Sequence, residues 1–473
     1  MTDRCQFLLR NKNRTCRFMA KAGHSYCGIH LFELKGEGAK RVPCPLDPAH
    51  TVLESELKTH IKKCNKRREQ IKAESLPTYC QDMQAGSDDE PELPQVSSSI
   101  PPGRARTESR IMHANSLGAT GLMQFIRKVE AVWDRFCSKP LAKNELRPTE
   151  CEPYMKSDGW RPFSKKHAVQ QASLIGNMME AGMFSTQNPV VVEFGAGRGY
   201  LSSMIADATN SKVFYLLDTA GPRLKADRSL RQTSDVKIQR LRSDIKHFDV
   251  TGIPEIGTAK SAWIGCGKHL CGAATDFTLR ASLSGFSKQA NSPEMSQGGN
   301  NLKGIAVATC CHHRCGWKSY VGKKLFREAG FSPQEFEMIS WMTGWALCGH
   351  GSSKSSSDGE EIESDAQENP QHHEQPPSKD EVPEEIHGHV HDVGLRGGDF
   401  NGNFWRGLSV EYRMAIGAKC KRLIDEGRWQ WLKDLSWNAQ LVEYVSAKVS
   451  PENKLLVVVP RVDVSNSGKE PVL

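Results

Sequence analysis

A glycine-rich stretch in the middle of the chain has the residue types that hold a nucleotide-like ligand. Residues 190–201 read Val-Val-Val-Glu-Phe-Gly-Ala-Gly-Arg-Gly-Tyr-Leu. Three β-branched residues in a row predict a buried parallel strand, and the glycines after it predict a turn that opens a helix. Gly195, Gly197 and Gly199 would let the backbone approach a ligand closely. A dinucleotide fingerprint would need glycine at position 200, where this chain has Tyr200, so the spacing favours the S-adenosylmethionine form of the turn.

Three acidic residues are placed to support the same ligand. Glu193 directly precedes the glycine turn. Asp218 ends the predicted second strand, 19 residues beyond Gly199, where a nucleotide-binding sheet carries a carboxylate for the ribose hydroxyls. Asp244 follows the third strand and is a candidate acceptor for an adenine amino group. The alternative for Asp218 is an ordinary cap of the next turn.

Two polar segments follow the fourth and fifth predicted strands. Residues 267–276 read Gly-Lys-His-Leu-Cys-Gly-Ala-Ala-Thr-Asp, and residues 310–315 read Cys-Cys-His-His-Arg-Cys. Ligands bind beyond the carboxyl ends of the strands in open α/β sheets, so we expect both segments to face the site. A third metal site in residues 310–315 is an alternative. Adjacent ligands without a second, separated pair make a poor tetrahedron, which favours a role in shaping the substrate pocket.

The first 30 residues contain four candidate zinc ligands. Cys5, Cys16, Cys27 and His30 have the spacing C-x10-C-x10-C-x2-H. Thiolates and an imidazole in this number can close a tetrahedral zinc site. His24 competes as the fourth ligand, and ordinary buried thiols are the alternative to a metal. So short a segment needs a staple to fold, which favours zinc.

A second set of zinc ligands follows directly. Cys44, His50, His60 and Cys64 have the spacing C-x5-H-x9-H-x3-C. We predict a helix over residues 56–66, on which His60 and Cys64 are four positions apart and share a face. Structural zinc would supply on the order of 10 kcal/mol of folding free energy to so small a module.

The positive charge of the chain is concentrated at its N-terminal end. The net charge is +8, and residues 1–80 hold 16 Lys and Arg against 8 Asp and Glu, an excess of the same size. Six of these basic residues surround the second zinc motif: Lys58, Lys62, Lys63, Lys66, Arg67 and Arg68. Charged helix faces are commonly just solvated, but this concentration on a zinc module favours contacts with phosphates.

We expect an intracellular soluble protein of the nucleus, the cytoplasm or both. The start, Met-Thr-Asp-Arg-Cys-Gln, has no apolar signal region. No window approaches the roughly 20 apolar residues of a membrane helix, so no membrane partner is expected. The 15 cysteines would then be reduced, and close clusters of them indicate a metal or a functional site.

The elements that must position these residues form an α/β domain. Beyond the first strand at Val190, the pattern predicts strands over residues 213–218, 236–244, 262–266, 304–309 and 455–460. It predicts helices over residues 119–139, 164–181, 201–208 and 408–426. Parallel strands with helices on both faces should meet at one ligand-binding edge.

Composition divides the chain into modules. We predict a CCCH-like zinc finger over residues 1–35, a CHHC zinc finger over 41–68 and a linker over 81–110. The α/β domain would then occupy residues 111–473. Within it, residues 352–397 are rich in Ser, Glu, Pro and His, which predicts a disordered insertion.

These motifs together resemble the eukaryotic tRNA 2′-O-methyltransferase family that modifies the ribose at position four of the acceptor stem. The resemblance rests on both zinc motifs, the glycine turn and the polar segments after the fourth and fifth strands. It implies a class I (Rossmann-like) methyltransferase sheet that uses S-adenosylmethionine. It also implies two structural zinc fingers and a tRNA substrate. The insertion at residues 352–397 has no counterpart in the pattern.

Transfer of a methyl group to a ribose hydroxyl needs a group that takes the hydroxyl proton. Lys268 and His269, at the end of the fourth strand, lie nearest the reactive methyl group in this class of enzyme. His312 and His313 are alternatives. Competing hypotheses are methylation of an RNA base or of a protein, and a non-catalytic zinc-finger adaptor that binds RNA. The sequence leaves the oligomeric state and the tRNA species open.

Overall fold

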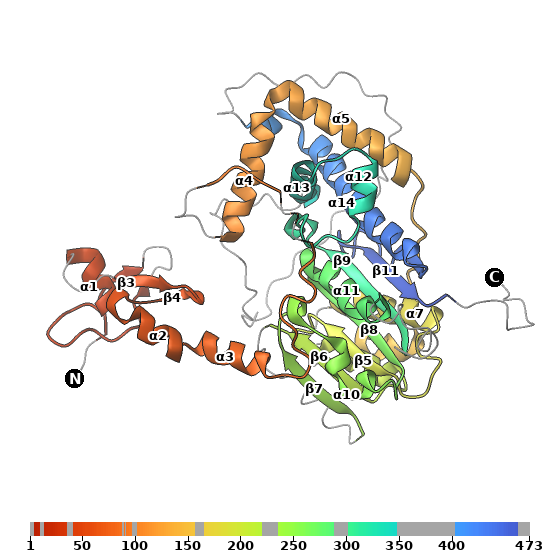
Figure 1. Cartoon of the computed structure of the whole chain (residues 1–473), viewed down its shortest axis with the longest axis horizontal. Coiled ribbons are helices and arrows are strands. Elements are labelled where there is room, and N and C mark those ends of the chain that lie inside the picture. The colour runs from red at the N-terminus through yellow and green to blue at the C-terminus, as the bar shows by residue number, and fades with distance from the viewer. Residues whose placement is uncertain are drawn as a thin grey trace, which may run out of the picture.

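The protein is an α/β protein with small N-terminal modules (Figure 1). The computed structural model describes residues 4–9, 14–35, 41–87, 89, 91–96, 102–156, 165–219, 235–287, 301–347 and 403–461. The insertion predicted at residues 352–397 lies outside these ranges.

A mixed sheet of seven strands runs through the described part of the α/β domain, in the order β10-β11-β9-β8-β5-β6-β7. The strands are β5 (Val190–Phe194), β6 (Val213–Asp218), β7 (Lys237–Arg242), β8 (Trp263–Cys271), β9 (Leu302–Cys310), β10 (Asn438–Glu443) and β11 (Lys454–Val459). The five from β9 to β7 are parallel, and β11 is antiparallel to both β9 and β10. Strand β5 is therefore central, with its glycine turn at the carboxyl edge of the parallel strands.

Both faces of the sheet are buried, as the β-branched start of β5 predicts. Val191 belongs to the core under α7 (Lys165–Glu180) and α8 (Tyr200–Ala208). Val190 and Val192 belong to the opposite core, under α11 (Ala273–Ser287). Successive side chains of a strand point to opposite faces, so a run of three apolar residues serves both layers.

A group of helices, which we call the helical cap, lies above β9 and β11 in the view of Figure 1. It consists of α4 (Pro102–Ser116), α5 (Gly118–Cys137), α12 (Lys323–Glu328), α13 (Pro333–Met342) and α14 (Val410–Asp434). Leu122, Phe125 and Ile126 of α5 are buried against these helices in one apolar core. Helix α14 also reaches the sheet, because Leu432 belongs to the core under α11.

The N-terminal modules lie to one side of the sheet (Figure 1). The first contains β1 (Leu8–Leu9), β2 (Arg14–Thr15) and α1 (Gly28–Lys35), and the second β3 (Arg41–Cys44), β4 (Asp47–Leu53) and α2 (Leu57–Lys63). Helix α3 (Asn65–Glu74) continues toward β7, where Arg242 Nη2 lies 3.0 Å from Glu69 Oε1.

The helix predicted over residues 56–66 is wrong in one respect, because the chain breaks at Cys64. Helix α2 ends at Lys63, and Cys64 has an extended backbone with φ −60° and ψ 134°. This break turns the Cys64 thiol toward Cys44, 3.9 Å away between the two Sγ atoms. The need to bring the thiols together therefore overrides the helical spacing.

The segment predicted as a linker, residues 81–110, is partly ordered against the rest of the protein. Gln84 Nε2 donates to the Phe248 carbonyl at 2.9 Å, and Asp89 accepts from Lys323 at 2.7 Å and from Arg327 at 2.7 Å. Helix α4 begins at Pro102, inside the predicted range. Asp89, in a stretch whose acidic composition indicates a solvated linker, thus finds basic partners on the helical cap.

Candidate functional site

The three glycines after β5 form the turn that the sequence predicts. Gly195, Gly197 and Gly199 have φ values of 64°, 48° and 79°, in the region that side chains disfavour. A Cβ atom on Gly195 would lie 2.9 Å from the Cδ2 atom of Leu270. The turn leads directly into α8, whose N-terminus therefore lies at the carboxyl edge of the central strand. Unpaired N–H groups at such a terminus favour polar or anionic ligands.

Asp218 and Asp244 hold neighbouring turns at this edge. Asp218 Oδ2 accepts from the Gly197 N–H at 2.8 Å, which ties the glycine turn to the end of β6. Asp244 Oδ1 accepts from the Lys246 N–H at 2.9 Å and begins a short 3-10 helix, Ile245–His247. Both residues also line the same cavity, so each supports the backbone and borders that cavity at once.

Glu193 lies beneath the turn. Its side chain is buried and accepts from the Ser202 N–H at 3.1 Å. Burial raises the pKa of this carboxyl to about 7, against the opposing effect of hydrogen bonds from Ser202. Glu193 does not belong to the lining of the cavity, and its contacts fix the start of α8.

A cavity of about 370 Å³, which we call the turn pocket, opens at the carboxyl ends of β5 to β8. Its lining includes Gly195, Asp218, Asp244, Cys271, Phe277 and Arg314. The volume is in the range of small-molecule sites, and a few convergent polar groups on an apolar wall are typical of them. The strands deliver these residues from five separate segments to one edge.

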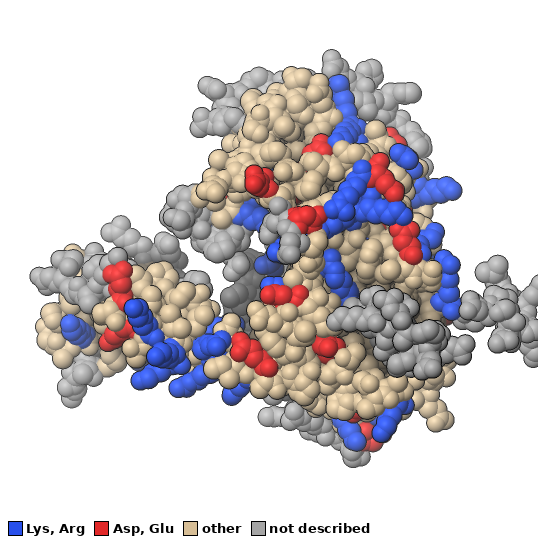
Figure 2. Space-filling model, in the orientation of Figure 1, with Lys and Arg blue, Asp and Glu red and all other residues tan. Residues whose placement is uncertain are grey.

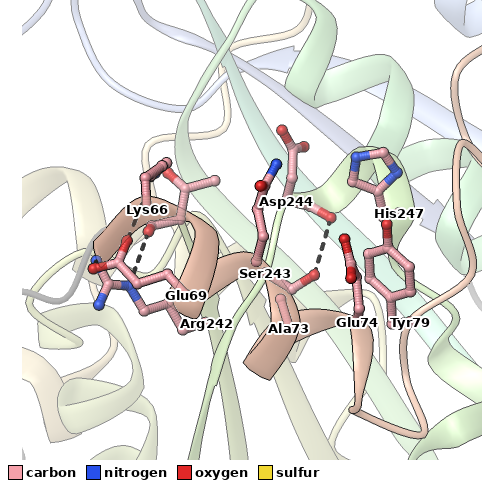
Figure 3. Close-up of a pocket in the computed structure, with 11 residues that line it drawn as sticks. Lys66, Glu69, Ala73, Glu74, Tyr79, Arg242, Ser243, Asp244 and His247 are labelled. Atoms are coloured by element: carbon pink, nitrogen blue, oxygen red, sulfur yellow. Dashed lines mark hydrogen bonds and ion pairs between the residues drawn. The ribbon is translucent and has the colours of Figure 1, made fainter. Parts of the chain in front are cut away.

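A second cavity of about 210 Å³, the adjoining pocket, lies between α3 and the end of β7 (Figure 3). It shares Thr219, Ser243 and Asp244 with the turn pocket. Glu69 and Ala73 of α3 form its other wall. The helix that follows the second N-terminal module therefore borders the same acidic edge as the glycine turn.

Lys268 is buried in β8, and its ammonium faces α7. The Nζ atom lies 3.0 Å from His167 Nδ1, and the side chain is 7% exposed. Burial lowers the pKa of Lys268 to about 8. Lys268 is not part of the turn-pocket lining. The side chain of His269, the other predicted catalytic residue, lies outside the described residues.

His312, an alternative base in the sequence, is instead part of a buried polar network. Its Nε2 atom lies 2.8 Å from Asp425 Oδ1, and both side chains are 1% exposed. Arg428 pairs with the same carboxylate at 3.1 Å and with Asp276 Oδ2 at 2.7 Å. The network locks α14 to the segments that follow β8 and β9, which leaves His312 a structural role. His313 is exposed.

Three thiols meet at the border of the turn pocket. The Sγ atoms of Cys271, Cys310 and Cys311 all lie within 4.8 Å of one another. Hydrogen bonds from Cys310 and Cys311 lower the pKa of the Cys271 thiol far below its usual value. The contact with Cys271 raises the pKa of Cys310.

The first zinc motif is assembled with His30. Cys5, Cys16, Cys27 and His30 bring their ligand atoms within 4.8 Å of one another, and all four are buried. His30 Nδ1 lies 3.3 Å from Cys5 Sγ and 3.4 Å from Cys27 Sγ. His24 is exposed and outside the cluster.

The second zinc motif is assembled as well. Cys44, His50, His60 and Cys64 also bring their ligand atoms within 4.8 Å of one another. Nε2 of His50 and Nε2 of His60 are 3.0 Å apart, and Cys64 Sγ lies 3.8 Å from His50 Nε2. Three thiolates with one imidazole, and two thiolates with two imidazoles, are both donor sets of structural zinc, so both clusters fit zinc.

Basic side chains gather along α2 and α3 (Figure 2). Lys58, Lys62, Lys63, Lys66 and Arg68 are exposed there. Two of the six predicted basic residues are engaged in ion pairs on α3, because Lys66 lies 3.8 Å from Glu69 and Arg67 lies 3.3 Å from Glu74. Among the described helices, none is long and apolar enough to span a bilayer.

Some residues of this region escaped the sequence analysis. His167 lies on α7, far from any motif, and Arg428 lies on α14. Neither has a spacing signal, since each meets its partners only through tertiary packing. The contact of Cys271 with Cys310 was also missed, because β8 and β9 run on to Cys271 and Cys310, beyond the predicted strand ends at residues 266 and 309.

Comparison with known protein families gives three matches. Residues 169–459 match a family described as methyltransferase TRM13. Residues 41–65 match the U11-48K-like CHHC zinc finger, and residues 3–31 match the CCCH zinc finger of TRM13 proteins. The α/β domain with its turn pocket is thus a methyltransferase domain, preceded by two zinc-finger domains.

The chain is also similar along nearly its whole length to proteins named tRNA:m(4)X modification enzymes. The TRM13 homologs of Mus musculus and Homo sapiens are each 32% identical, over 97% of this chain and 94% of theirs. The protein of Saccharomyces cerevisiae is 26% identical over 96% of this chain and 95% of its own. No solved structure matches. The chain belongs to the TRM13 methyltransferase family, as the resemblance of its motifs predicts.

Proposed function

We propose that the protein transfers a methyl group from S-adenosylmethionine to the ribose 2′-hydroxyl at position four of a tRNA acceptor stem. The relatives named above are tRNA modification enzymes. The sheet would be a class I (Rossmann-like) methyltransferase sheet, and the two N-terminal clusters would hold structural zinc.

The observation that carries this proposal is the position of the turn pocket in the sheet. From β5 the chain proceeds to β6 and β7 on one side, then crosses to β8 and β9 on the other. The strand order therefore reverses beside β5, and open α/β sheets bind their ligands at the carboxyl edge of such a reversal. The turn pocket lies at that edge.

The residues around the pocket suit S-adenosylmethionine. The glycine turn leaves room for the backbone to approach a ligand, since no heavy atom would lie within 4 Å of a Cβ on Gly197. Asp218 would accept from the ribose hydroxyls of the cofactor, and Asp244 from its adenine amino group. Phe277 supplies apolar surface. When bound, the cofactor supplies an electrophilic methyl group on a sulfonium.

Lys268 is the base that we propose for the acceptor hydroxyl. A neutral amine accepts a proton, and burial brings the pKa of Lys268 to about 8, near the pH at which a general base works best. His167 would hold the Lys268 amine through their 3.0 Å contact. His269 stays a second candidate.

The zinc fingers would supply affinity for tRNA. The exposed lysines of α2 can contact phosphates, which give most of the sequence-independent affinity for nucleic acid. Helix α3 connects this surface to the acidic edge of the sheet through the Glu69–Arg242 ion pair. A bound RNA would therefore be held by the fingers while its acceptor ribose enters beside the glycine turn.

The test is a reaction of the full chain with methyl-labelled S-adenosylmethionine and total tRNA, followed by mass spectrometry of the nucleosides. We expect 2′-O-methylated nucleosides, and we expect Asp218→Ala to weaken cofactor binding measured by calorimetry. The control is Lys237→Ala, at an exposed site at the start of β7, the end of the strand away from the turn pocket. It should leave cofactor binding unchanged. Label on a base or on protein would instead support one of the other acceptors. Absence of cofactor binding would support the adaptor hypothesis.

A further inference from the structure

The structure brings together three thiols that neither zinc finger uses. Cys271 ends β8, Cys310 ends β9, and Cys311 follows it at the start of the 3-10 helix His312–Arg314. Their sulfur atoms lie within 4.8 Å of one another. We propose that Cys271, Cys310 and Cys311 bind a third zinc ion at the border of the turn pocket.

The backbone is bent in a way that serves this cluster. Adjacent residues of a strand point to opposite faces, so two adjacent thiols meet only where the strand is broken. Cys311 has a left-handed backbone with φ 47°, a conformation that strains a residue with a side chain. Such strain is retained where the surrounding structure or a ligand requires it.

Gly272 allows the two segments to approach. Its φ is +58°, and a Cβ atom on it would lie 2.5 Å from the backbone carbonyl carbon of Arg314. Any larger residue would push the turn after β9 away from the end of β8. A metal site in residues 310–315 alone would have only adjacent ligands. Cys271, from the neighbouring strand, supplies a ligand that is distant in the chain.

The spacing of the sulfur atoms fits one ion. Zinc–sulfur bonds of about 2.3 Å at tetrahedral angles separate the sulfurs by about 3.8 Å. In the CHHC cluster the two sulfurs are 3.9 Å apart. Within each finger cluster, as among the three thiols, the ligand atoms lie within 4.8 Å of one another. Three thiolates select a soft or borderline ion such as zinc over magnesium or calcium.

The third site differs from the fingers in having an open side. Each finger cluster offers four ligand atoms, whereas no fourth His, Cys, Asp or Glu joins these thiols among the side chains that the structure describes. Cys271 is half-buried and lines the turn pocket. Zinc with three protein ligands keeps its fourth position for water or a ligand. That position would face the turn pocket.

The first test is the zinc content of the full chain, purified with reductant and without chelator. We expect three zinc ions per chain by elemental mass spectrometry, one for each cluster. Cys271→Ser and, independently, Cys311→Ser should each remove one ion, and Cys44→Ser should remove a different one. Cys80→Ser, an exposed thiol outside the clusters, should remove none. Thermal unfolding of each variant shows whether it is folded.

Cobalt tests the open position. In cobalt-substituted protein, the absorption that is lost in Cys271→Ser should shift when imidazole is added, because the third site has room for it and the closed fingers do not. Two zinc ions in the reduced wild-type chain would overturn the proposal. So would iron in place of zinc, a disulfide between two of these thiols, or a full zinc content in folded Cys271→Ser. An unshifted cobalt spectrum would contradict the open fourth position.

Discussion

Lys268 makes the pH dependence of the reaction a test of a single residue. Its folded pKa is lowered to about 8 by burial, so below that pH it carries a proton and cannot accept another. We expect turnover at saturating substrate to rise about tenfold per pH unit below that value and to level off above it. The measurement is the initial rate of methyl transfer across this pH range.

Substitution of Lys268 separates its chemistry from its packing. Lys268→Ala should slow turnover by about 10²- to 10⁴-fold while leaving the cofactor Kd nearly unchanged. Lys268→Arg should not restore the rate, because a guanidinium stays protonated. Lys260→Ala, at an exposed site before β8, is the control. Full turnover of Lys268→Ala, or a rate that is flat across pH 8, would assign the base to another group.

At the scale of elements, Arg428 joins α14 to the segments that follow β8 and β9. It is fully buried and pairs with both Asp276 and Asp425. Removing one partner from a buried ionic cluster leaves uncompensated charge, which costs about 3–5 kcal/mol. We therefore expect Arg428→Ala to lower the free energy of unfolding by that amount in chemical denaturation.

An exposed residue of the same helix serves as the reference. Lys433→Ala loses the contact of its exposed ammonium with the Trp429 ring at 4.2 Å and should change the stability by less than about 1 kcal/mol. If Arg428→Ala proved as stable as the Lys433 variant, the network around Asp425 would not anchor α14.

The elements differ in how far their sequence determines them. Strands β5 and β6 could be predicted from their runs of apolar residues, because both strands are buried along most of their length. Helix α5 could be predicted from its periodic apolar residues, because one face of it is buried. Strand β10 was not predicted, since it is short and Val442 is the one β-branched or aromatic residue within Asn438–Glu443. Pairing with β11 decides its conformation.

In the candidate site, too, some residues could be predicted from the sequence and others could not. The glycine turn and Asp218 could be predicted, because local backbone requirements and strand order restrict which residues stand there. The partner of Lys268 could not be predicted, since His167 is 101 positions away in the chain. The break at Cys64 was missed for a related reason: helical spacing of His60 and Cys64 indicates a continuous helix, whereas the position of Cys44 requires the chain to turn.

At the scale of the whole molecule, the proposed function assigns separable tasks to the basic surface on α2 and to the turn pocket. Lys62 and Lys63 are exposed on α2. Replacing both by Ala should weaken tRNA binding and flatten its salt dependence by about one unit of slope for each phosphate that the protein no longer neutralises. The Kd of the cofactor should stay the same, because the substitutions lie outside both pockets. Fluorescence titration at several salt concentrations measures the effect.

The control is a double variant, Lys237→Ala with Lys260→Ala. It removes the same charge from exposed sites at the amino-terminal ends of β7 and β8, away from the turn pocket. Point substitutions suit this test better than removal of residues 1–80, because α3 forms a wall of the adjoining pocket. Equal salt slopes for the two double variants would mean that the fingers do not dock the RNA.

We propose above that this protein methylates one ribose of tRNA. The most direct test of this claim is to map the labelled nucleotide after reaction of the full chain with methyl-labelled S-adenosylmethionine and single purified tRNAs. We predict one labelled 2′-O-methyl nucleotide, at position four of the acceptor stem, and a much slower appearance of the same label with Lys268→Ala. Label at another position, on a base or on the protein itself would contradict that claim.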